Sequence, residues 1–201
     1  RREKIYTRKI EGFFQRVRLF TGWPLLVGYF LLPWISWDGR QSVLFDLPQR
    51  KFDILGLTFW PQDFPMLAFL LIIAAYALFA VTTFAGRIWC GYTCPQTVWT
   101  SIFMWIEQKT EGSRNQRIRL DKAPWSGQKI ARKGAKHLGW LYVGYVTGFT
   151  FVGYFYPIRE LLPDLWSGQL GGWPLFWIGF FTLATYTNAG WMREQVCMYM
   201  C

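Results

Sequence analysis

The sequence contains very little histidine, cysteine and acid. It has 201 residues with one histidine, four cysteines and 12 acidic residues against 22 lysines and arginines, which leaves a net charge of +10. One histidine cannot supply both axial ligands of a bis-histidine haem, so a transmembrane cytochrome b is disfavoured. The basic start of the chain runs into polar residues, so it does not have the pattern of a signal peptide.

Charged residues are absent from four windows, each about as long as the helix needed to cross ~30 Å of hydrocarbon. The windows are residues 19–37, 65–86, 138–156 and 173–192. A soluble domain of this size rarely combines 20% aromatic residues with such an excess of basic charge. The sequence therefore predicts an all-α membrane protein with four transmembrane helices in two hairpins, plus interfacial amphipathic helices.

Basic residues are distributed unevenly between these windows. Seven precede the first window and ten lie in residues 87–137, whereas residues 38–64 hold three and residues 157–172 hold one. By the positive-inside rule, the N-terminus and the 87–137 loop are cytoplasmic. We therefore expect a multi-pass protein with both of these segments on the cytoplasmic side.

The predicted organisation has five segments. Residues 1–18 form a basic interfacial segment, for which a solvated tail is the alternative, and residues 19–86 form the first hairpin. Residues 87–137 are a cytoplasmic loop, residues 138–192 the second hairpin, and residues 193–201 the start of a further ferredoxin-like region. Because the chain opens on arginine and stops inside a motif, we expect it to be an excerpt of a longer protein.

The four cysteines form two pairs with the same Cys-x-x-x-Cys spacing. Cys90 and Cys94 are followed by Pro95, and Cys197 and Cys201 end the sequence. Cysteines four residues apart lie on one helical face, or flank the turn before a helix that begins at the proline. The predicted spans place both pairs at the reducing cytoplasmic face, where disulfides are rare. Soft thiolates suit Cu(I), zinc or iron–sulfur clusters, so we predict all four cysteines as metal ligands and redox-active residues.

Each cysteine pair also follows an arginine. Arg87 lies three residues before Cys90, and Arg193 lies four residues before Cys197. Both cations, and the helix N-terminus expected at Cys94, favour the thiolate form. A single Cys-x-x-x-Cys pair is also compatible with cysteines that are packed as small apolar residues and bind no metal. Two matched pairs favour a metal site. The recurrence of an apolar window, an Ala-Gly step, an arginine and a cysteine pair indicates an internal repeat.

The segment after Pro95 predicts an interfacial helix. Apolar residues recur there at helical spacing, at Trp99, Ile102, Phe103 and Ile106. The basic run from Arg114 to Lys136 is predicted to be a solvated connection that faces lipid headgroups, and docking of an acidic partner is the alternative.

Three stretches carry a family resemblance: RKIEGFFQRVR, FDLPQRKFDILGLTFWPQDF and GRIWCGYTCPQTVW. They closely resemble the cytochrome c oxidase accessory protein family (CcoG, also called FixG or RdxA). The resemblance implies a polyferredoxin of the bacterial inner membrane, an oxidoreductase that reduces Cu(II) to Cu(I) during assembly of cbb3-type oxidase. It carries the motif over to Cys90, Cys94, Pro95, Cys197 and Cys201. It also implies 4Fe-4S clusters, which we expect mainly in a C-terminal part that lies beyond this sequence.

The resemblance also implies partners. These are the lipid bilayer, copper transport and chaperone proteins, and oxidase assembly factors; a homodimer is left open and no nucleic acid is expected. Two other functions remain open. One is the membrane anchor of a quinol-oxidising polyferredoxin chain, which quinol dependence would indicate. The other is a non-enzymatic copper chaperone or scaffold, which a metal of constant oxidation state would indicate.

Overall fold

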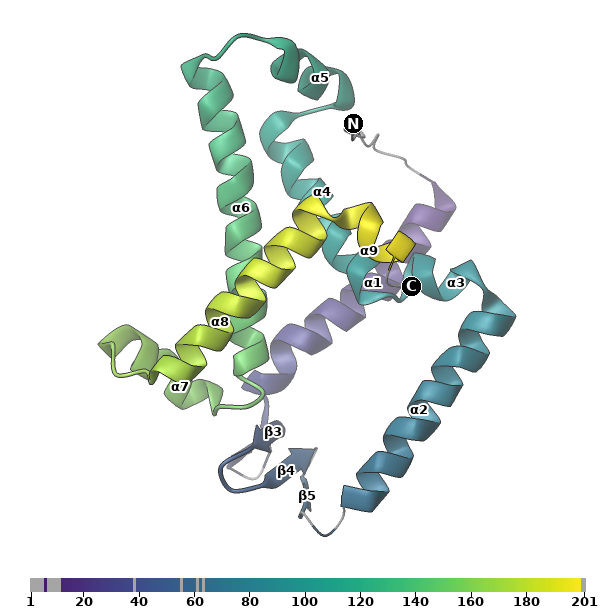
Figure 1. Cartoon of the computed structure of the whole chain (residues 1–201), viewed down its shortest axis with the longest axis vertical. Helices are drawn as coiled ribbons and strands as arrows, with labels where there is room; N and C mark the ends of the chain where they lie inside the picture. The colour runs from purple at the N-terminus through teal and green to yellow at the C-terminus, as the bar shows by residue number, and fades with distance from the viewer. Residues whose placement is uncertain are drawn as a thin grey trace.

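The computed structural model describes residues 6, 12–37, 39–54, 56–60, 62 and 64–199. The described chain is mainly helical, and two small antiparallel sheets lie between its first two long helices (Figure 1). The helical elements are α1 (Phe13–Leu31), the 3-10 turn η1 (Leu32–Trp34), α2 (Phe64–Ala85), α3 (Arg87–Tyr92), α4 (Pro95–Glu111), α5 (Arg114–Lys122), α6 (Gly127–Val152), α7 (Ile158–Ser167), α8 (Gly172–Thr185), the π-helix η3 (Tyr186–Trp191) and α9 (Arg193–Tyr199).

The prediction of an all-α protein with four membrane-spanning helices is wrong. Among the described residues, one helix is long and apolar enough to cross a membrane, and its apolar stretch is Pro65–Ala85 in α2. The region between α1 and α2, which the prediction treats as the connection within the first hairpin, forms strands. They are β1 (Ser36–Trp37), β2 (Arg40–Gln41), β3 (Val43–Asp46), β4 (Lys51–Ile54) and β5 (Leu57–Phe59).

The other three charge-free windows do not coincide with long apolar helices. α1 begins at Phe13, so it includes Arg16 and Arg18, and it ends at Leu31. α6 begins at Gly127, contains several basic residues in its first turns and ends at Val152. α8 has 14 residues and passes directly into the π-helix η3. The absence of charge over a run of residues therefore did not predict where a helix begins and ends.

The larger sheet, β3-β4-β5, lies at one end of the molecule. β3 pairs with β4 in antiparallel register from Val43–Ile54 to Asp46–Lys51, and β5 adds to the other edge of β4. The sheet is tied to the loop after α6, because the Phe45 N–H donates to the Tyr154 carbonyl at 2.8 Å. The Gln41 side chain adds a bond to the Gly153 carbonyl at 2.7 Å. These bonds close the end of the helical layer that is far from the cysteines.

The helical core forms where α6 packs against α8 and α4. The α6–α8 contact depends on two glycines, because a Cβ at Gly144 would lie 2.9 Å from the Thr182 carbonyl oxygen and one at Gly148 would lie 2.8 Å from that of Ile178. This arrangement is a small-xxx-small contact, in which missing side chains let two backbones approach closely. Around it, one apolar cluster is formed by Phe149, Val152, Ile158, Leu161 and Ile178, and a second by Phe103, Trp140 and Ala189.

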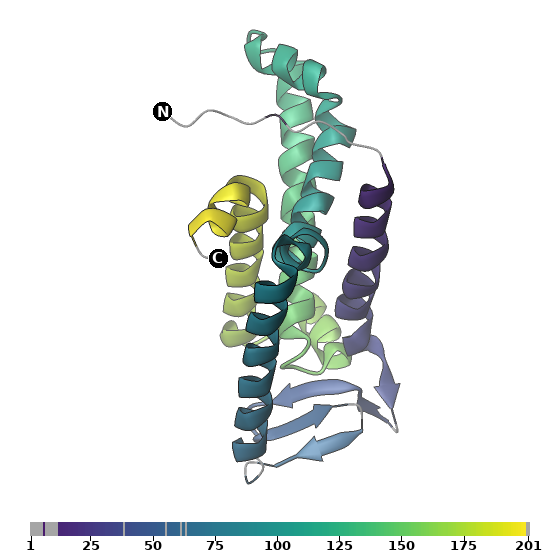
Figure 2. The same cartoon turned by 90° about the vertical axis from the view of Figure 1, so that its right-hand side faces the viewer.

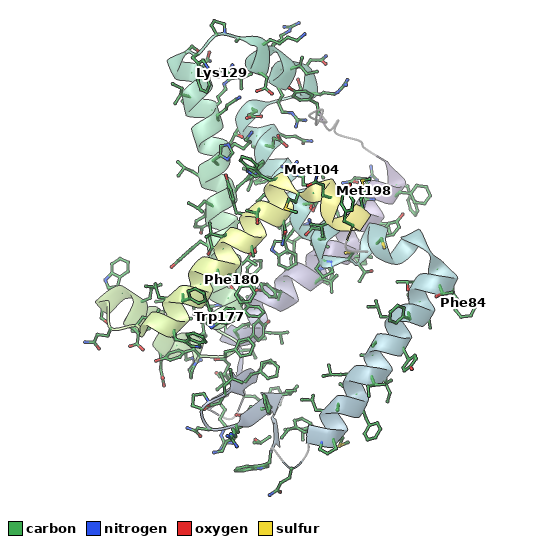
Figure 3. The ribbon with its side chains drawn as sticks, in the orientation of Figure 1. Phe84, Met104, Lys129, Trp177, Phe180 and Met198 are labelled. Carbon is green, nitrogen blue, oxygen red and sulfur yellow. The ribbon has the colours of Figure 1, made fainter. Side chains whose placement is uncertain are left out.

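α2 stands along the side of this core, between the sheet and α3 (Figures 1 and 2). None of residues 65–85 is buried by other parts of the described protein. Phe84 is 93% exposed and points away from the other helices (Figure 3). Leucine, isoleucine and phenylalanine side chains exposed along a whole helix are favourable in lipid and unfavourable in water, so α2 supports an association with a membrane.

Candidate functional site

The first cysteine pair lies where α3 meets α4. Cys90 is in α3 and is exposed, whereas Cys94 is half-buried and is the N-cap residue of α4. Pro95 occupies the first turn of α4, where its missing N–H leaves no bond unmade. The Cys94 carbonyl accepts from the backbone N–H groups of Thr97 at 3.0 Å and Val98 at 3.2 Å. The prediction of a helix that begins at Pro95 is therefore confirmed.

The motif is held by bonds to its backbone, which leave both sulfurs free. The Thr97 hydroxyl donates to the Cys90 carbonyl at 2.7 Å, which closes the turn between α3 and α4. From α1, the Thr21 hydroxyl lies 3.2 Å from the Tyr92 carbonyl. Gly22 of α1 is buried, and a Cβ built on it would lie 3.5 Å from a Val98 methyl group. Three elements therefore fix the path of the chain through Cys90 and Cys94.

The second pair follows the same local pattern. Cys197 lies in the short helix α9, which comes after the π-helix at the end of α8, as Cys90 lies in the short helix α3 after α2. The side chain of Cys197 and the whole of Cys201 lie outside the described residues. The similarity of the two arrangements agrees with the internal repeat read in the sequence.

The structure brings α3, which carries Cys90, and α9, which carries Cys197, to neighbouring levels of the molecule. The two short helices lie at similar heights along the long axis in both views (Figures 1 and 2). A direct bond joins their surroundings, because the Gln96 side-chain amide donates to the Asn188 carbonyl at 3.0 Å. Gln96 is two residues after Cys94, and Asn188 is in the π-helix that leads to α9. π-helical turns of this kind often occur at functional sites.

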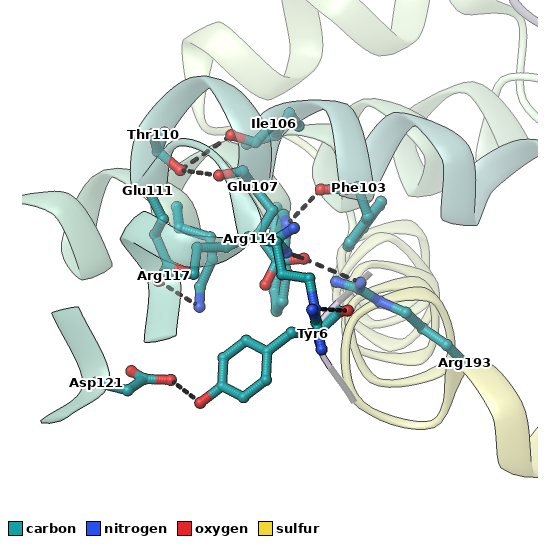
Figure 4. Close-up of polar contacts among 12 residues, drawn as sticks. Tyr6, Phe103, Ile106, Glu107, Thr110, Glu111, Arg114, Arg117, Asp121 and Arg193 are labelled. Atoms are coloured by element: carbon teal, nitrogen blue, oxygen red, sulfur yellow. Dashed lines mark hydrogen bonds and ion pairs between the residues drawn. The ribbon is translucent and has the colours of Figure 1, made fainter. Parts of the chain in front are cut away.

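Arg193 joins α9 to α4, and its described polar contacts are with groups other than a thiol. Its Nη1 lies 3.1 Å from Oε2 of Glu107 (Figure 4), and its Nε donates to the Ala189 carbonyl at 2.9 Å. Arg117 from α5 binds the same Glu107 oxygen at 3.3 Å. The Arg193 guanidinium also lies 4.9 Å from the centre of the Trp140 ring. The side chain of Arg87, the other predicted supporting cation, lies outside the described residues.

The basic run from Arg114 to Lys136 is only partly solvated: Arg114, Arg119, Lys122 and Arg132 are exposed as predicted, whereas three other basic residues are not. Arg117, Lys129 and Lys136 are buried, with 3–5% of each residue exposed. Lys136 pairs with Glu111 at 2.7 Å, and the Lys129 ammonium donates to two carbonyls at the end of α5. Buried charges of this kind are stable because each has an opposite charge or an acceptor. The sequence signal that could have revealed them is the pair Glu107 and Glu111, one turn apart in a largely apolar helix.

Two further polar contacts lie near this network. The Tyr6 hydroxyl donates to Asp121 at 2.7 Å (Figure 4), and this bond, with burial and the carboxylate charge, raises the pKa of Tyr6. The histidine, His137, has its Nδ1 2.9 Å from the Tyr186 hydroxyl. That nitrogen therefore has a protein partner.

Thiolates are the ligands that iron–sulfur clusters use, and a 4Fe-4S cluster needs four of them. Cys90 and Cys94 are accessible, unpaired thiols held by a fixed backbone, so they fit such a group in chemistry. Two thiols fill half of the ligand set. Within the described part of the chain, no group of three or more histidine, cysteine or acidic side chains could hold a metal ion. A complete site therefore needs ligands beyond those whose side chains are described.

Comparison with protein families defines the class of this site. Residues 67–111 match the family described as "4Fe-4S binding domain". The match covers nearly all of α2, the whole of α3 and α4, and therefore Cys90 and Cys94. It corrects the expectation that iron–sulfur chemistry lies mainly beyond this sequence, because a 4Fe-4S binding domain lies within it.

The chain is homologous over its whole length to curated proteins. It is 42% identical to nitrogen fixation protein FixG of Rhizobium meliloti, 40% to protein RdxA and 37% to protein RdxB of Cereibacter sphaeroides. Each alignment covers 100% of this chain but 39%, 44% and 43% of the three relatives, so the chain spans about two fifths of their length. No solved structure matches it significantly. The resemblance to FixG and RdxA is therefore confirmed, and the comparisons support an iron–sulfur electron-transfer protein.

Proposed function

We propose that Cys90, Cys94, Cys197 and Cys201 together form one redox site that holds a 4Fe-4S cluster at the surface of a membrane. The observation that carries this proposal is the Gln96–Asn188 bond, which joins the α4 N-terminus at Cys94 to the segment that leads to Cys197. Two thiols from each motif make the four that a cluster requires. Such a cluster, when bound, supplies one electron at a time.

The residues around the thiols have defined parts in this proposal. Pro95 sets the start of α4 and so the direction of Cys94. Arg193 at the start of α9 pairs with Glu107 of α4, which ties the helix that carries Cys197 to the helix that follows Cys94. The N-terminus of α4 carries a partial positive charge, which stabilises an anion at Cys94. The exposed position of Cys90 gives a redox partner access to the site.

The cluster proposal is tested by iron content. In the full-length protein, Cys90→Ser/Cys94→Ser and Cys197→Ser should each lower bound iron by about four atoms per molecule, the content of one 4Fe-4S cluster. Iron and acid-labile sulfide are measured on anaerobically purified protein, with Ser101→Ala as a control that retains all thiols. Loss of iron from the first variant but not from the second would show that the two motifs do not share a cluster.

We further propose that the reaction served by this site is the reduction of Cu(II) to Cu(I). The copper ion gains one electron from a reduced iron–sulfur donor, and no covalent bond forms or breaks. The resemblance to the oxidase accessory family supports copper as substrate, with copper transport and chaperone proteins and assembly factors of cbb3-type oxidase as partners.

We propose the bacterial inner membrane as the location, with the cysteine end of α2 on the cytoplasmic side. The sheet that precedes α2 contains Asp46 and Asp53. The chain that follows α2 leads to the basic segment of α5 and α6. The positive-inside rule places such a basic end in the cytoplasm. In membranes from iron-depleted cells, in which the thiols carry no cluster, a maleimide that cannot cross membranes should leave Cys90 unlabelled in spheroplasts and label it in inverted vesicles. Labelling in spheroplasts would reverse the orientation.

A further inference from the structure

The end of the molecule formed by α5 and the start of α6 carries an excess of exposed positive charge. Residues 114–136 contain eight lysines and arginines but one acidic residue, Asp121. The exposed members of this set are Arg114, Arg119, Lys122 and Arg132. The carboxylates of Glu107, Glu111 and Asp121 pair with other cations, and within the described part of the chain no carboxylate pairs with these four. Their charge is therefore available to an outside partner.

An exposed tryptophan occurs in the same stretch. Trp125, in the turn between α5 and α6, is 79% exposed, and the Lys129 ammonium lies 5.3 Å from the centre of its ring. Arg119 and Lys122 are three residues apart in α5, so they share one face of that helix. Tryptophan and arginine are enriched where proteins contact one another. We call Arg119, Lys122, Trp125 and Arg132 the α5–α6 surface.

This surface lies away from the segment that fits a membrane. α2 has 22 residues and is therefore ~33 Å long, enough to fill ~30 Å of hydrocarbon. α5 and the turn after it lie beyond the α3 end of α2 in both views (Figures 1 and 2). α4, which leads from Cys94 to α5, has 17 residues and is ~25 Å long. Charge interactions in water are screened over about 10 Å at 0.1 M salt, so lipid headgroups attract this surface little and a soluble partner fits it better.

We propose that the α5–α6 surface docks a soluble, acidic one-electron carrier protein that supplies the redox site with electrons. Opposite charges on the two proteins speed their encounter. A folded protein of about 100 residues is roughly 30 Å across, so a carrier held at this surface can extend along α4 to the level of the exposed Cys90. The carrier is oxidised by one electron and the site is reduced by one, with no bond formed or broken. The identity of the partner as an electron carrier rests on the proposed function, whereas the docking of an acidic protein does not.

The test is binding of a plant-type 2Fe-2S ferredoxin, a small acidic electron carrier, to the full-length protein in zwitterionic detergent. Isothermal titration calorimetry at low salt gives the Kd. Arg119→Gln/Lys122→Gln/Arg132→Gln should raise the Kd about tenfold, because each exposed ion pair contributes a factor of about two to three. Raising the ionic strength should weaken binding of the wild type and narrow its difference from the variant.

The matched control removes the same charge from exposed positions in β2, the β3–β4 turn and α7. Arg40→Gln/Arg50→Gln/Arg159→Gln should leave the Kd within about twofold of the wild type. Both variants should keep the iron content of the wild type, which excludes unfolding as the cause of weaker binding.

Three results would overturn the docking proposal: no binding of ferredoxin, equal Kd values for the two variants, or protection of α5 from hydrogen exchange by anionic but not zwitterionic nanodiscs. The last would assign the surface to lipid headgroups. A wild-type protein that holds no iron but binds ferredoxin with the expected charge dependence would refute the proposed cluster and leave the docking surface standing.

Discussion

Replacing Cys90 and Cys94 together by alanine should abolish more than nine tenths of copper reduction, and so should replacing Cys197 and Cys201. The variant with all four replacements should lose little more, because residues that act as one unit are strongly non-additive. The measurement is Cu(I) formation in the full-length protein supplied with reductant, followed with a chelator specific for Cu(I). Thr93→Ser, between the two cysteines of the first motif, is the matched control and should keep full activity.

Two other results would contradict this expectation in different ways. Losses that add from one pair to the other would show two independent sites. Unchanged reduction in every variant would place the chemistry outside this chain. Combined with iron content, the same variants separate two uses of the thiols: loss of iron and activity indicates a cluster, whereas loss of activity with full iron indicates direct copper binding.

Replacing Glu107 by glutamine should destabilise the fold by about 3–5 kcal/mol, the usual cost of removing one member of a buried ion pair. The carboxylate serves Arg117 at 3.3 Å and Arg193 at 3.1 Å, so its loss leaves two cations facing each other. The side chain of Arg117 is 3% exposed, so water cannot solvate its guanidinium after the carboxylate charge is lost. The free energy of unfolding is measured by urea titration in detergent, with tryptophan fluorescence as the signal.

The control for this variant is Lys133→Gln. Lys133 pairs with Asp121 at 2.8 Å, but the two side chains are 29% and 19% exposed, so this pair should contribute about 1 kcal/mol or less. Equal effects of the two substitutions would mean that Glu107 is no more than a surface charge. Because Arg193 links Glu107 to α9, we also expect Glu107→Gln to weaken any activity that needs Cys197.

The parts of the site that follow from local chemistry could be predicted from the sequence. Pro95 at the first turn of α4, and the thiol pair flanking the turn before it, follow from rules that involve few residues. The four-residue spacing of Gly144 and Gly148 is present in the sequence, but nothing there identifies the residues of α8 that the two glycines contact. The apolar helix 65–86 was also predicted correctly, because uninterrupted hydrophobicity over that length fits few other structures.

The parts that depend on long-range pairing could not be predicted. Strands β3, β4 and β5 have only three or four residues each, nearly all of them half-buried, and this is too short for a clear alternation. Lys136 was read as solvated because its partner Glu111 comes from another helix. A lysine of the surface and a lysine of a buried pair have the same local sequence pattern, so only packing distinguishes them.

The exposure of α2 has a consequence for how this sequence can change over time. No residue from 65 to 85 is buried and most are exposed, so exchanges among leucine, isoleucine, phenylalanine and valine alter little packing within the described protein. Substitutions should therefore accumulate freely in α2 as long as its composition stays apolar. Gly148 has no such freedom, since any side chain would meet the α8 backbone. α2, whose hydrophobicity makes it the most clearly predicted helix in the sequence, is thus the helix whose individual residues are least constrained in evolution.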